Sequence, residues 1–126
     1  MPVYTIPVTT VGADGAATGS ETTDFDFPTA FLDAIAVEFG ATAPATTTVV
    51  VAESEGLGRT LLSLAAGNTD KTYYPRHLLH KEDGTDDTVR DMFVIQGPIS
   101  ITVDDCNALS PAVTVKVSVL ISGQIR

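Results

Sequence analysis

Hydrophobic and polar residues alternate most regularly in two stretches of the chain, residues 98–104 and 113–121. Successive side chains of a β-strand point to opposite faces, so each stretch predicts a strand with one buried face. The link between them, residues 105–111, is polar and rich in turn residues, which predicts a β-hairpin. A hairpin alone is only marginally stable, so we expect further strands to cover it. The positions predicted to be buried are Ile99, Ile101, Val103, Val113, Val115, Val117, Val119 and Ile121.

Shorter segments of strand character occur through the rest of the chain. Turn residues separate the strands that we predict at residues 3–11, 47–52, 59–64, 72–79 and 92–96. Residues 47–52 include three consecutive valines, which predicts a strand covered on both faces. Pro7 and Pro75 lack the backbone N–H that a sheet ladder requires, so they predict sheet edges or a bulge. Two intervening segments are predicted to be loops, the flexible Gly/Ala/Thr-rich residues 12–24 and the charged residues 80–91.

Residues 31–39 fit both a strand and a helix. With period two, the shared face would carry Phe31, Asp33, Ile35, Val37 and Phe39; with the helical period it would carry Phe31, Ala34, Ile35 and Glu38. The β-branched and aromatic residues at alternate positions, followed by Gly40, favour the strand. A sheet with one packed helix at residues 28–39 is the alternative.

The resulting series of about eight strands, spaced roughly 8–12 residues apart, is typical of sandwiches and jelly rolls. We therefore predict an all-β fold, an antiparallel β-sandwich or jelly roll. The length of 126 residues predicts that 1–126 form a single domain, with residues 12–24 as its flexible segment.

Charge restricts the classes of partner. The formal net charge is −9, with seven basic residues, which argues against binding nucleic acid or an anionic membrane surface. A hydrophobic content of 44% is that of a globular chain, and no apolar run approaches the roughly 20 residues of a transmembrane helix. The first residues lack the basic and apolar regions of a signal peptide, so we expect folding in a reducing cytoplasm.

Candidate catalytic and metal-binding residues are few. His77 and His80 would point to opposite faces of a strand, so they do not predict a shared metal site. The acidic residues 82–87 offer oxygen ligands for calcium but lack the spacing of an EF-hand loop, which favours a solvated loop. Residues 56–60 lack the lysine and following helix of a phosphate-binding loop.

Nucleophilic side chains have no recognisable partners in the sequence. Ser63, Cys106 and Ser110 lack an identifiable His–Asp constellation, although such triads are recognised in space. Cys106 is the single cysteine, which rules out an intramolecular disulfide and is interpreted as a small hydrophobic residue. We predict no enzyme activity, no catalytic residues, no cofactor and no metal.

Three side chains are candidates for protein contacts. We predict that Arg59, Tyr74 and Arg76 contribute to a contact surface or fix the turn over residues 68–76. Arginine can pair with carboxylates through two parallel hydrogen bonds, and the chain has few basic residues. The alternative is a structural arginine that holds loop carbonyl groups.

Several segments, in order, resemble a family of small tailed-bacteriophage proteins encoded among the head genes. They are Ile35-Ala36-Val37-Glu38-Phe39, Pro44-Ala45-Thr46-Thr47-Thr48-Val49, Gly58-Arg59-Thr60-Leu61-Leu62, Asn68-Thr69-Asp70-Lys71-Thr72-Tyr73-Tyr74-Pro75-Arg76 and Gly97-Pro98-Ile99-Ser100-Ile101-Thr102-Val103 with the closing valine-rich strand. The resemblance covers roughly residues 30–122 and implies a capsid cement (decoration) protein. The chain departs from the family pattern by its longer acidic loop at residues 80–91 and by Cys106.

This resemblance and the charge lead to one functional prediction. We expect a structural virion protein on the outer capsid surface, because packed DNA would repel a protein of charge −9 inside the head. The expected partners are the major capsid protein and further copies of this chain, as a homo-dimer or homo-trimer, with no nucleic acid and no membrane. The alternative is a β-sandwich of a tail or fibre that binds a host receptor or glycan; a β-sandwich hydrolase ranks third.

Overall fold

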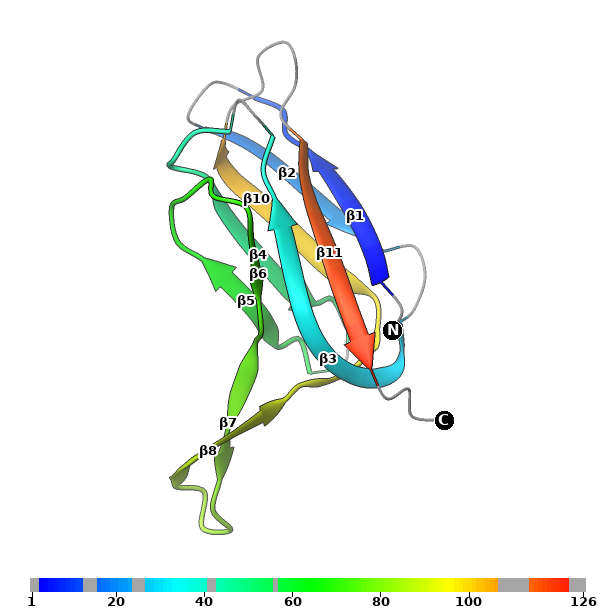
Figure 1. Cartoon of the computed structure of the whole chain (residues 1–126), viewed down its shortest axis with the longest axis vertical. Helices are drawn as coiled ribbons and strands as arrows, with labels where there is room; N and C mark the ends of the chain where they lie inside the picture. The colour runs from blue at the N-terminus through cyan, green and yellow to red at the C-terminus, as the bar shows by residue number, and fades with distance from the viewer. Residues whose placement is uncertain are drawn as a thin grey trace.

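Two antiparallel β-sheets pack face to face, and a two-stranded hairpin projects from one end of them (Figure 1). The computed structural model describes residues 3–12, 16–23, 27–40, 43–55, 57–106 and 114–122. These residues form an all-β structure without a helix, so they include no helix able to cross a membrane. The predicted antiparallel sandwich is confirmed, and the helix alternative for residues 28–39 is wrong.

The described residues form eleven strands, more than the eight or so predicted. Their bounds are β1 (Val3–Thr9), β2 (Ala17–Thr22), β3 (Phe27–Glu38), β4 (Thr48–Glu53), β5 (Thr60–Leu64), β6 (Lys71–Tyr73), β7 (Arg76–His80), β8 (Asp86–Met92), β9 (Val94–Gly97), β10 (Ile99–Cys106) and β11 (Thr114–Ser122). The first sheet has the order β1-β11-β3-β6, with β9 also paired to β3; the second has the order β2-β10-β4-β5. β7 and β8 pair with each other in the projecting hairpin.

The core lies between the two main sheets, and the alternating residues of β10 and β11 fill it. All of the predicted core positions in β10 and β11 that the structure describes are at most 1% exposed. Val113, the remaining one, lies outside the described residues. Cys106 is also buried, which confirms its interpretation as a small hydrophobic residue.

The predicted β10–β11 hairpin is wrong. β10 lies between β2 and β4, whereas β11 lies between β1 and β3 in the opposite sheet. The chain therefore crosses from one layer to the other after β10. Period-two alternation reveals which face of a strand is buried but not which strand pairs with it, because two strands facing each other across a sandwich have the same pattern.

β3 is a strand, as predicted, but a bulge changes the face on which its first residues lie. Its register with β11 passes from Ala34↔Leu120 to Leu32↔Ile121, which leaves Asp33 without a partner position. Leu32 is therefore fully buried, whereas Phe31 is only half-buried. A bulge adds one residue to a strand and so interrupts the alternation that the sequence pattern assumes.

Two segments that we predicted to be loops contain strands. Ala17–Thr22 forms β2 at the edge of the second sheet, and Asp86–Met92 forms β8. β2 passes very close to β1 at Gly19, where a Cβ would lie 2.7 Å from the carbonyl oxygen of Thr9, and its other residues are small or polar. This composition hides the strand, because small and polar residues carry no hydrophobic period.

Two other predictions concerned the faces and edges of strands. β4 buries Val49 and Val51, but Val50 on its other face is only half-buried, so the prediction of two covered faces is wrong. Pro7 lies in edge strand β1, as predicted. Pro75 separates β6 from β7, so the single strand predicted for residues 72–79 is two strands that belong to different sheets.

We predict that Val117→Asp lowers the free energy of unfolding by several kcal/mol. Val117 is fully buried between Ile6 and Val37 of the neighbouring strands, and a carboxylate there would have no partner. Thermal and denaturant unfolding would measure the loss. Lys116→Asp, at an exposed position of the same strand, is the control; equal stability of the two variants would contradict the register of β11.

Candidate functional site

The hairpin of β7 and β8, residues 76–92, is here called the arm; it extends away from the sandwich (Figure 1). Its two strands join through a tight turn in which the Lys81 amide donates to the Thr85 carbonyl oxygen at 2.8 Å. Gly84 adopts a φ of 87° in this turn, a conformation that favours glycine. The carboxylate of Asp83 accepts hydrogen bonds from the amide and the hydroxyl of Thr85, at 3.0 and 2.7 Å. These bonds lower the pKa of Asp83 and order the acidic turn.

Arg76 attaches the first strand of the arm to the sandwich. Its Nη1 donates to the carbonyl oxygens of Asp33 and Pro75, at 3.0 and 2.8 Å. Its Nη2 lies 3.8 Å from the Asp33 carboxylate. The bulge in β3 and the break at Pro75 are therefore held together by one guanidinium group. Arg76 thus has the structural role that we considered as the alternative to a contact role.

Phe93 anchors the second strand of the arm. Its side chain is 9% exposed, and its carbonyl oxygen accepts a hydrogen bond from the Leu32 amide at 2.8 Å. The ring of His77 lies 5.0 Å from the Phe93 ring, centroid to centroid, and His77 Nε2 is 3.2 Å from the Met92 carbonyl oxygen. Aromatic side chains bury a large apolar area, so the Phe93 ring fixes the point where the second strand of the arm rejoins the sandwich.

Arg59 also lies over the Phe93 ring, and its ion pair with Glu53 is the shortest among the described residues. Its Nε and Nη2 donate to the two carboxylate oxygens of Glu53 at 2.7 and 3.0 Å. Nη2 also donates to the Val94 carbonyl oxygen at 2.7 Å, and the guanidinium carbon lies 5.4 Å from the Phe93 ring centre. Arg59 therefore links the end of β4, the start of β9 and Phe93.

The Glu53–Arg59 pair is partly buried, and both the burial and the hydrogen bonds within the pair affect the pKa values of the two residues. The side chain of Glu53 is 7% exposed and that of Arg59 is 33% exposed. The side-chain hydrogen bond from Arg59 holds the pKa of Glu53 below its ordinary value, against the desolvation that would raise it. The same bond raises the pKa of Arg59. Glu53 is therefore a charged residue at the edge of the core, and Arg59 is the residue that keeps it ionised.

A shallow hollow of about 210 Å³ lies beside this ion pair. It is lined by Thr29, Glu53, Leu57, Arg59, Val94 and Gln96. Leu57 is 81% exposed and Val94 is 40% exposed, so the hollow has an apolar rim around an ion pair. Large exposed hydrophobic side chains near one another are typical of protein contact surfaces.

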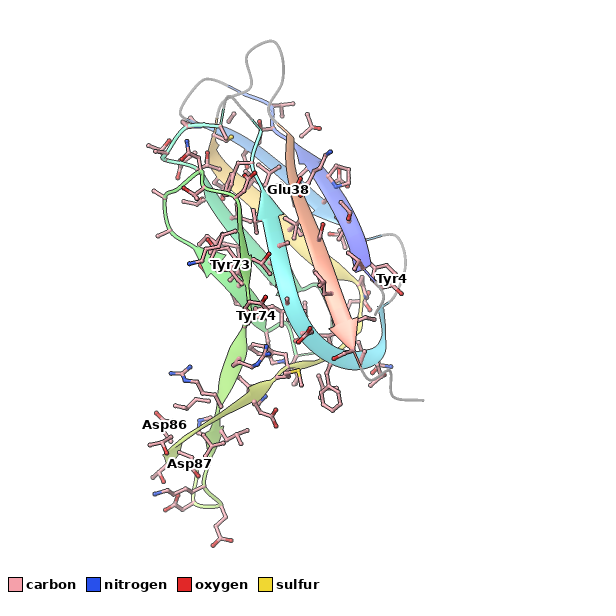
Figure 2. The ribbon with its side chains drawn as sticks, in the orientation of Figure 1. Tyr4, Glu38, Tyr73, Tyr74, Asp86 and Asp87 are labelled. Carbon is pink, nitrogen blue, oxygen red and sulfur yellow. The ribbon has the colours of Figure 1, made fainter. Side chains whose placement is uncertain are left out.

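The three residues predicted to make contacts lie near the base of the arm. Arg59 and Arg76 are each about one-third exposed, and both bind groups of this chain next to the arm: Arg59 binds Glu53 and the Val94 carbonyl oxygen, and Arg76 binds Asp33 and the Pro75 carbonyl oxygen. Tyr74 is 64% exposed and lies where the chain leaves β6 for the arm (Figure 2). The sequence did not point to Leu57 or Phe93, because a lone leucine in a loop and a phenylalanine between two strands have no distinctive pattern.

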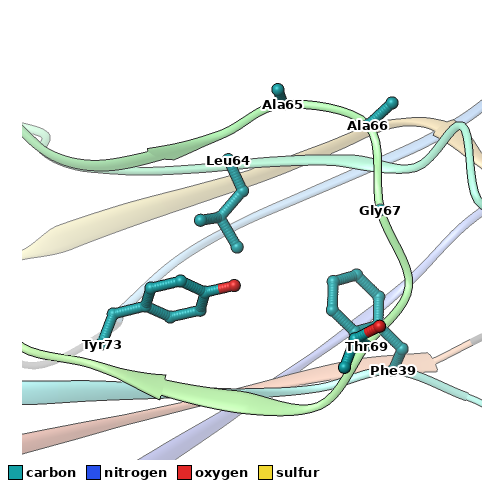
Figure 3. A pocket seen from close by; sticks show the side chains of 7 residues that line it. All are labelled: Phe39, Leu64, Ala65, Ala66, Gly67, Thr69 and Tyr73. Atoms are coloured by element: carbon teal, nitrogen blue, oxygen red, sulfur yellow. The ribbon is translucent and has the colours of Figure 1, made fainter.

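A second hollow, of about 240 Å³, lies at the side of the sandwich where β5 and β6 end the two sheets (Figure 3). Its lining is Phe39, Leu64, Ala65, Ala66, Gly67, Thr69 and Tyr73. The side chains of Phe39, Leu64 and Tyr73 pack against the core from this side. Apolar and polar atoms both line the hollow, with two side-chain hydroxyl groups and no charged side chain, so it offers contact area without a charged side chain for acid–base chemistry.

The remaining candidates for chemistry are separate from one another. His80 Nε2 lies 3.1 Å from Asp86 across the arm, whereas His77 packs on Phe93, so the two histidines do not share a site. Within the described ranges, no group of three metal-ligating side chains is close enough to hold an ion. Ser63 is exposed on β5, and Ser110 lies outside the described residues.

No protein-family model and no curated protein matches this chain. Among solved structures, the serine protease of Aeromonas sobria is similar with a TM-score of 0.49 and 13% sequence identity, over 97% of this chain and 27% of the protease. Tailspike protein 4 of bacteriophage CBA120 has a TM-score of 0.39 and 13% identity, over 95% of this chain and 18% of the tailspike.

The VP2 subviral particle of infectious bursal disease virus has a TM-score of 0.32 and 13% identity, over 98% of this chain and 38% of VP2. The chain thus spans well under half the length of each of these proteins. Similarity at this level carries no argument about function, which must come from the chain's own residues.

We predict that Arg59→Met lowers the free energy of unfolding by about 1–3 kcal/mol near neutral pH, because the buried Glu53 carboxylate loses its charged partner and keeps only the hydrogen bond from the backbone amide of residue 59. In the wild type, the lowered pKa of Glu53 contributes stability above the ordinary pKa of glutamic acid, and this contribution is lost as the pH falls through the lowered value. In the variant, desolvation should raise that pKa, so the deficit relative to wild type should shrink on acidification. Denaturant unfolding at about pH 7 and about pH 4 measures both effects.

Arg90→Met is the matched control, since Arg90 is exposed on the arm. It should change the stability by no more than about 0.5 kcal/mol. A deficit of Arg59→Met that is equal at both pH values would contradict the role of Arg59 as the partner that keeps Glu53 ionised.

Proposed function

We propose that this protein is a structural component of a phage virion that binds the outer surface of the capsid and stabilises the shell. The observation that carries the proposal is the arm: a hairpin projects from a sandwich whose strands are packed around one core. A protein that links subunits of a shell needs a rigid body and an element that reaches beyond it. The resemblance of residues 30–122 to phage decoration proteins supports the same function.

The charge of the chain supports the outer surface as its location. At a formal charge of −9, the protein would be repelled by the phosphates of DNA packed inside a head. On the outside, the same charge keeps many copies soluble before they bind. The partners we propose are therefore the major capsid protein and other copies of this chain.

Binding would stabilise the shell by mass action. If the protein binds the assembled shell but not free subunits, each bound copy favours the shell. A copy that contacts two or more subunits adds the benefit of multivalency, so weak individual contacts suffice. This function requires no catalysis.

Self-association at a capsid symmetry axis is part of this proposal. Symmetry axes impose matching symmetry on a protein that binds there, which favours a homo-dimer or homo-trimer. The edge strands β1 and β6, next to Pro7 and Pro75, have one side without a strand partner among the described residues. Such edges offer pairing surfaces, and the prolines limit uncontrolled association in solution.

One observation favours the second candidate function, a glycan- or receptor-binding module of a tail or fibre. The hollow in Figure 3 is lined by Phe39 and Tyr73, and sugars stack on aromatic rings. Copy number separates the two functions, because a cement protein is present in hundreds of copies and a fibre protein in few. Densitometry of purified virions against the major capsid protein measures it.

We predict that virions lacking this protein release DNA at a lower temperature than decorated virions. Dye access to the packaged DNA during heating measures the release, and adding back purified protein should restore the wild-type temperature. Equal heat tolerance of bare and decorated particles would contradict the cement function and favour the fibre function.

We further predict that Tyr74→Ser weakens binding to bare heads without lowering the melting temperature of the protein. Tyr74 is 64% exposed, so it contributes little to folding, and exposed tyrosines are frequent in the energetic centre of protein contacts. Val3→Ser, at a position 55% exposed on β1, is the control. Unchanged co-sedimentation of Tyr74→Ser with heads would exclude Tyr74 from the contact, and Arg76→Ala would test the arginine in the same assay.

A further inference from the structure

We propose that the outer part of the arm, residues 78–91, is a docking surface for a positively charged and partly apolar surface of a different protein. That this protein is a capsid subunit rests on the proposed function. The chemistry of the docking surface is argued from the arm itself and does not depend on that function. Four features of the arm support this inference: its exposure, its fixed carboxylates, its exposed apolar residue and its rigid base.

The arm has two strand edges without a partner among the described residues. β7 and β8 form a two-stranded sheet of their own, and neither pairs with a strand of the sandwich. A hairpin with no covering layer is marginally stable in water. Such an element is expected to gain stability when another surface covers it.

The carboxylates of the arm are numerous and fixed in orientation. Residues 81–91 carry five acidic and two basic side chains, a formal charge of −3. Three of these carboxylates accept hydrogen bonds from nearby backbone amides: Asp83 from Thr85 at 3.0 Å, Asp87 from Thr88 at 2.7 Å and Asp91 from Met92 at 2.7 Å. A carboxylate held in this way loses less conformational entropy on binding a lysine or arginine than a free one.

Apolar side chains accompany the charges. Val89, in the middle of β8, is 53% exposed, and Leu78 and Leu79 of β7 are only half-buried. Buried apolar area supplies affinity, and complementary charges supply orientation and association rate. The arm therefore fits a partner surface that combines basic and apolar residues.

A second copy of this chain does not fit the arm. Each copy carries a net charge of −9 and only seven basic residues. Two of these, Arg59 and Arg76, are bound to Glu53 and to groups at Asp33 and Pro75. Pairing two acidic arms, or an acidic arm with an acidic sandwich, would bring like charges together. Any self-association of the chain must use other surfaces.

The base of the arm fixes the direction in which the docking surface points. Arg76 holds the first strand to β3, and Phe93 anchors the second strand beneath His77 and Arg59. The carboxylates of the arm are thereby held at a defined place relative to the sandwich. Asp86 and Asp87 lie in the part of the arm that is far from the sandwich (Figure 2). A preorganised surface binds with less loss of entropy than a mobile loop of the same charge.

The test is a charge reversal at the tip with a matched reversal elsewhere. The arm variant is Asp86→Lys with Asp87→Lys; the control is Glu21→Lys with Glu38→Lys, at exposed positions of β2 and β3. Both variants change the net charge equally, and Glu38 lies at the end of the sandwich far from the arm (Figure 2).

The binding assay uses phage heads purified from a phage that lacks this protein. Binding is measured by co-sedimentation of the protein with these heads at several salt concentrations.

We expect the arm variant to bind heads about tenfold more weakly than wild type at low salt, with a weaker dependence on salt. The control variant should bind at least as well as wild type. Equal loss in both variants, or no loss in the arm variant, would overturn the inference. Melting curves of both variants check that each is folded.

A second measurement separates this inference from the proposed function. If the wild-type protein does not bind heads at all, the proposed function is wrong. The docking surface is then tested separately, by adding a peptide of alternating lysine and leucine residues to the protein. Amide shifts of the isotope-labelled full chain should then change most between Leu78 and Asp91. Equal changes at Glu21 and Glu38 would overturn the docking surface.

Discussion

The burial of two valine- and isoleucine-rich strands against each other is the constraint on which this structure depends. β10 and β11 each lie inside their own sheet, and their alternating side chains belong to one hydrophobic cluster between the two layers. Each strand buries its apolar face against the other sheet. Because its backbone N–H and C=O groups are then buried as well, each strand needs a neighbour on both edges to complete its hydrogen bonds. β1 and β3 do this for β11, and β2 and β4 do it for β10.

The second feature that determines the shape is a set of contacts at one end of the sandwich. The bulge at Asp33, the proline at residue 75 and the buried ring of Phe93 let the chain leave the first sheet, form the arm and return. At the base of the arm, Arg76 binds the carbonyl groups of Asp33 and Pro75, and Arg59 binds the Val94 carbonyl group and the Glu53 carboxylate beside Phe93. These contacts fix the places where the chain enters and leaves the arm.

The structure also separates two kinds of surface on one small protein. The hollow between the ends of β5 and β6 is lined by apolar and polar atoms without a charged side chain, whereas the arm is acidic with one exposed valine. The two surfaces therefore differ in charge, and the acidic arm is the one that a basic surface would complement.

Local patterns in the sequence determined the all-β class, the strands with alternating residues and the burial of their apolar positions, because alternation is a property of the strand itself. The sequence also indicated Arg59, Tyr74 and Arg76 as candidates for contacts, because arginine and tyrosine side chains combine a large surface with groups that form hydrogen bonds. The pairing of β10 and β11 with other strands was decided by tertiary structure, because facing strands and paired strands have the same alternation. The arm was hidden because its second strand is charged on both faces, and β2 was hidden because its small and polar residues carry no hydrophobic period, including the glycine that its close approach to β1 requires at position 19. The roles of the two arginines depended on where the bulge at Asp33 and the ring of Phe93 lie in space, and no local pattern contains that information.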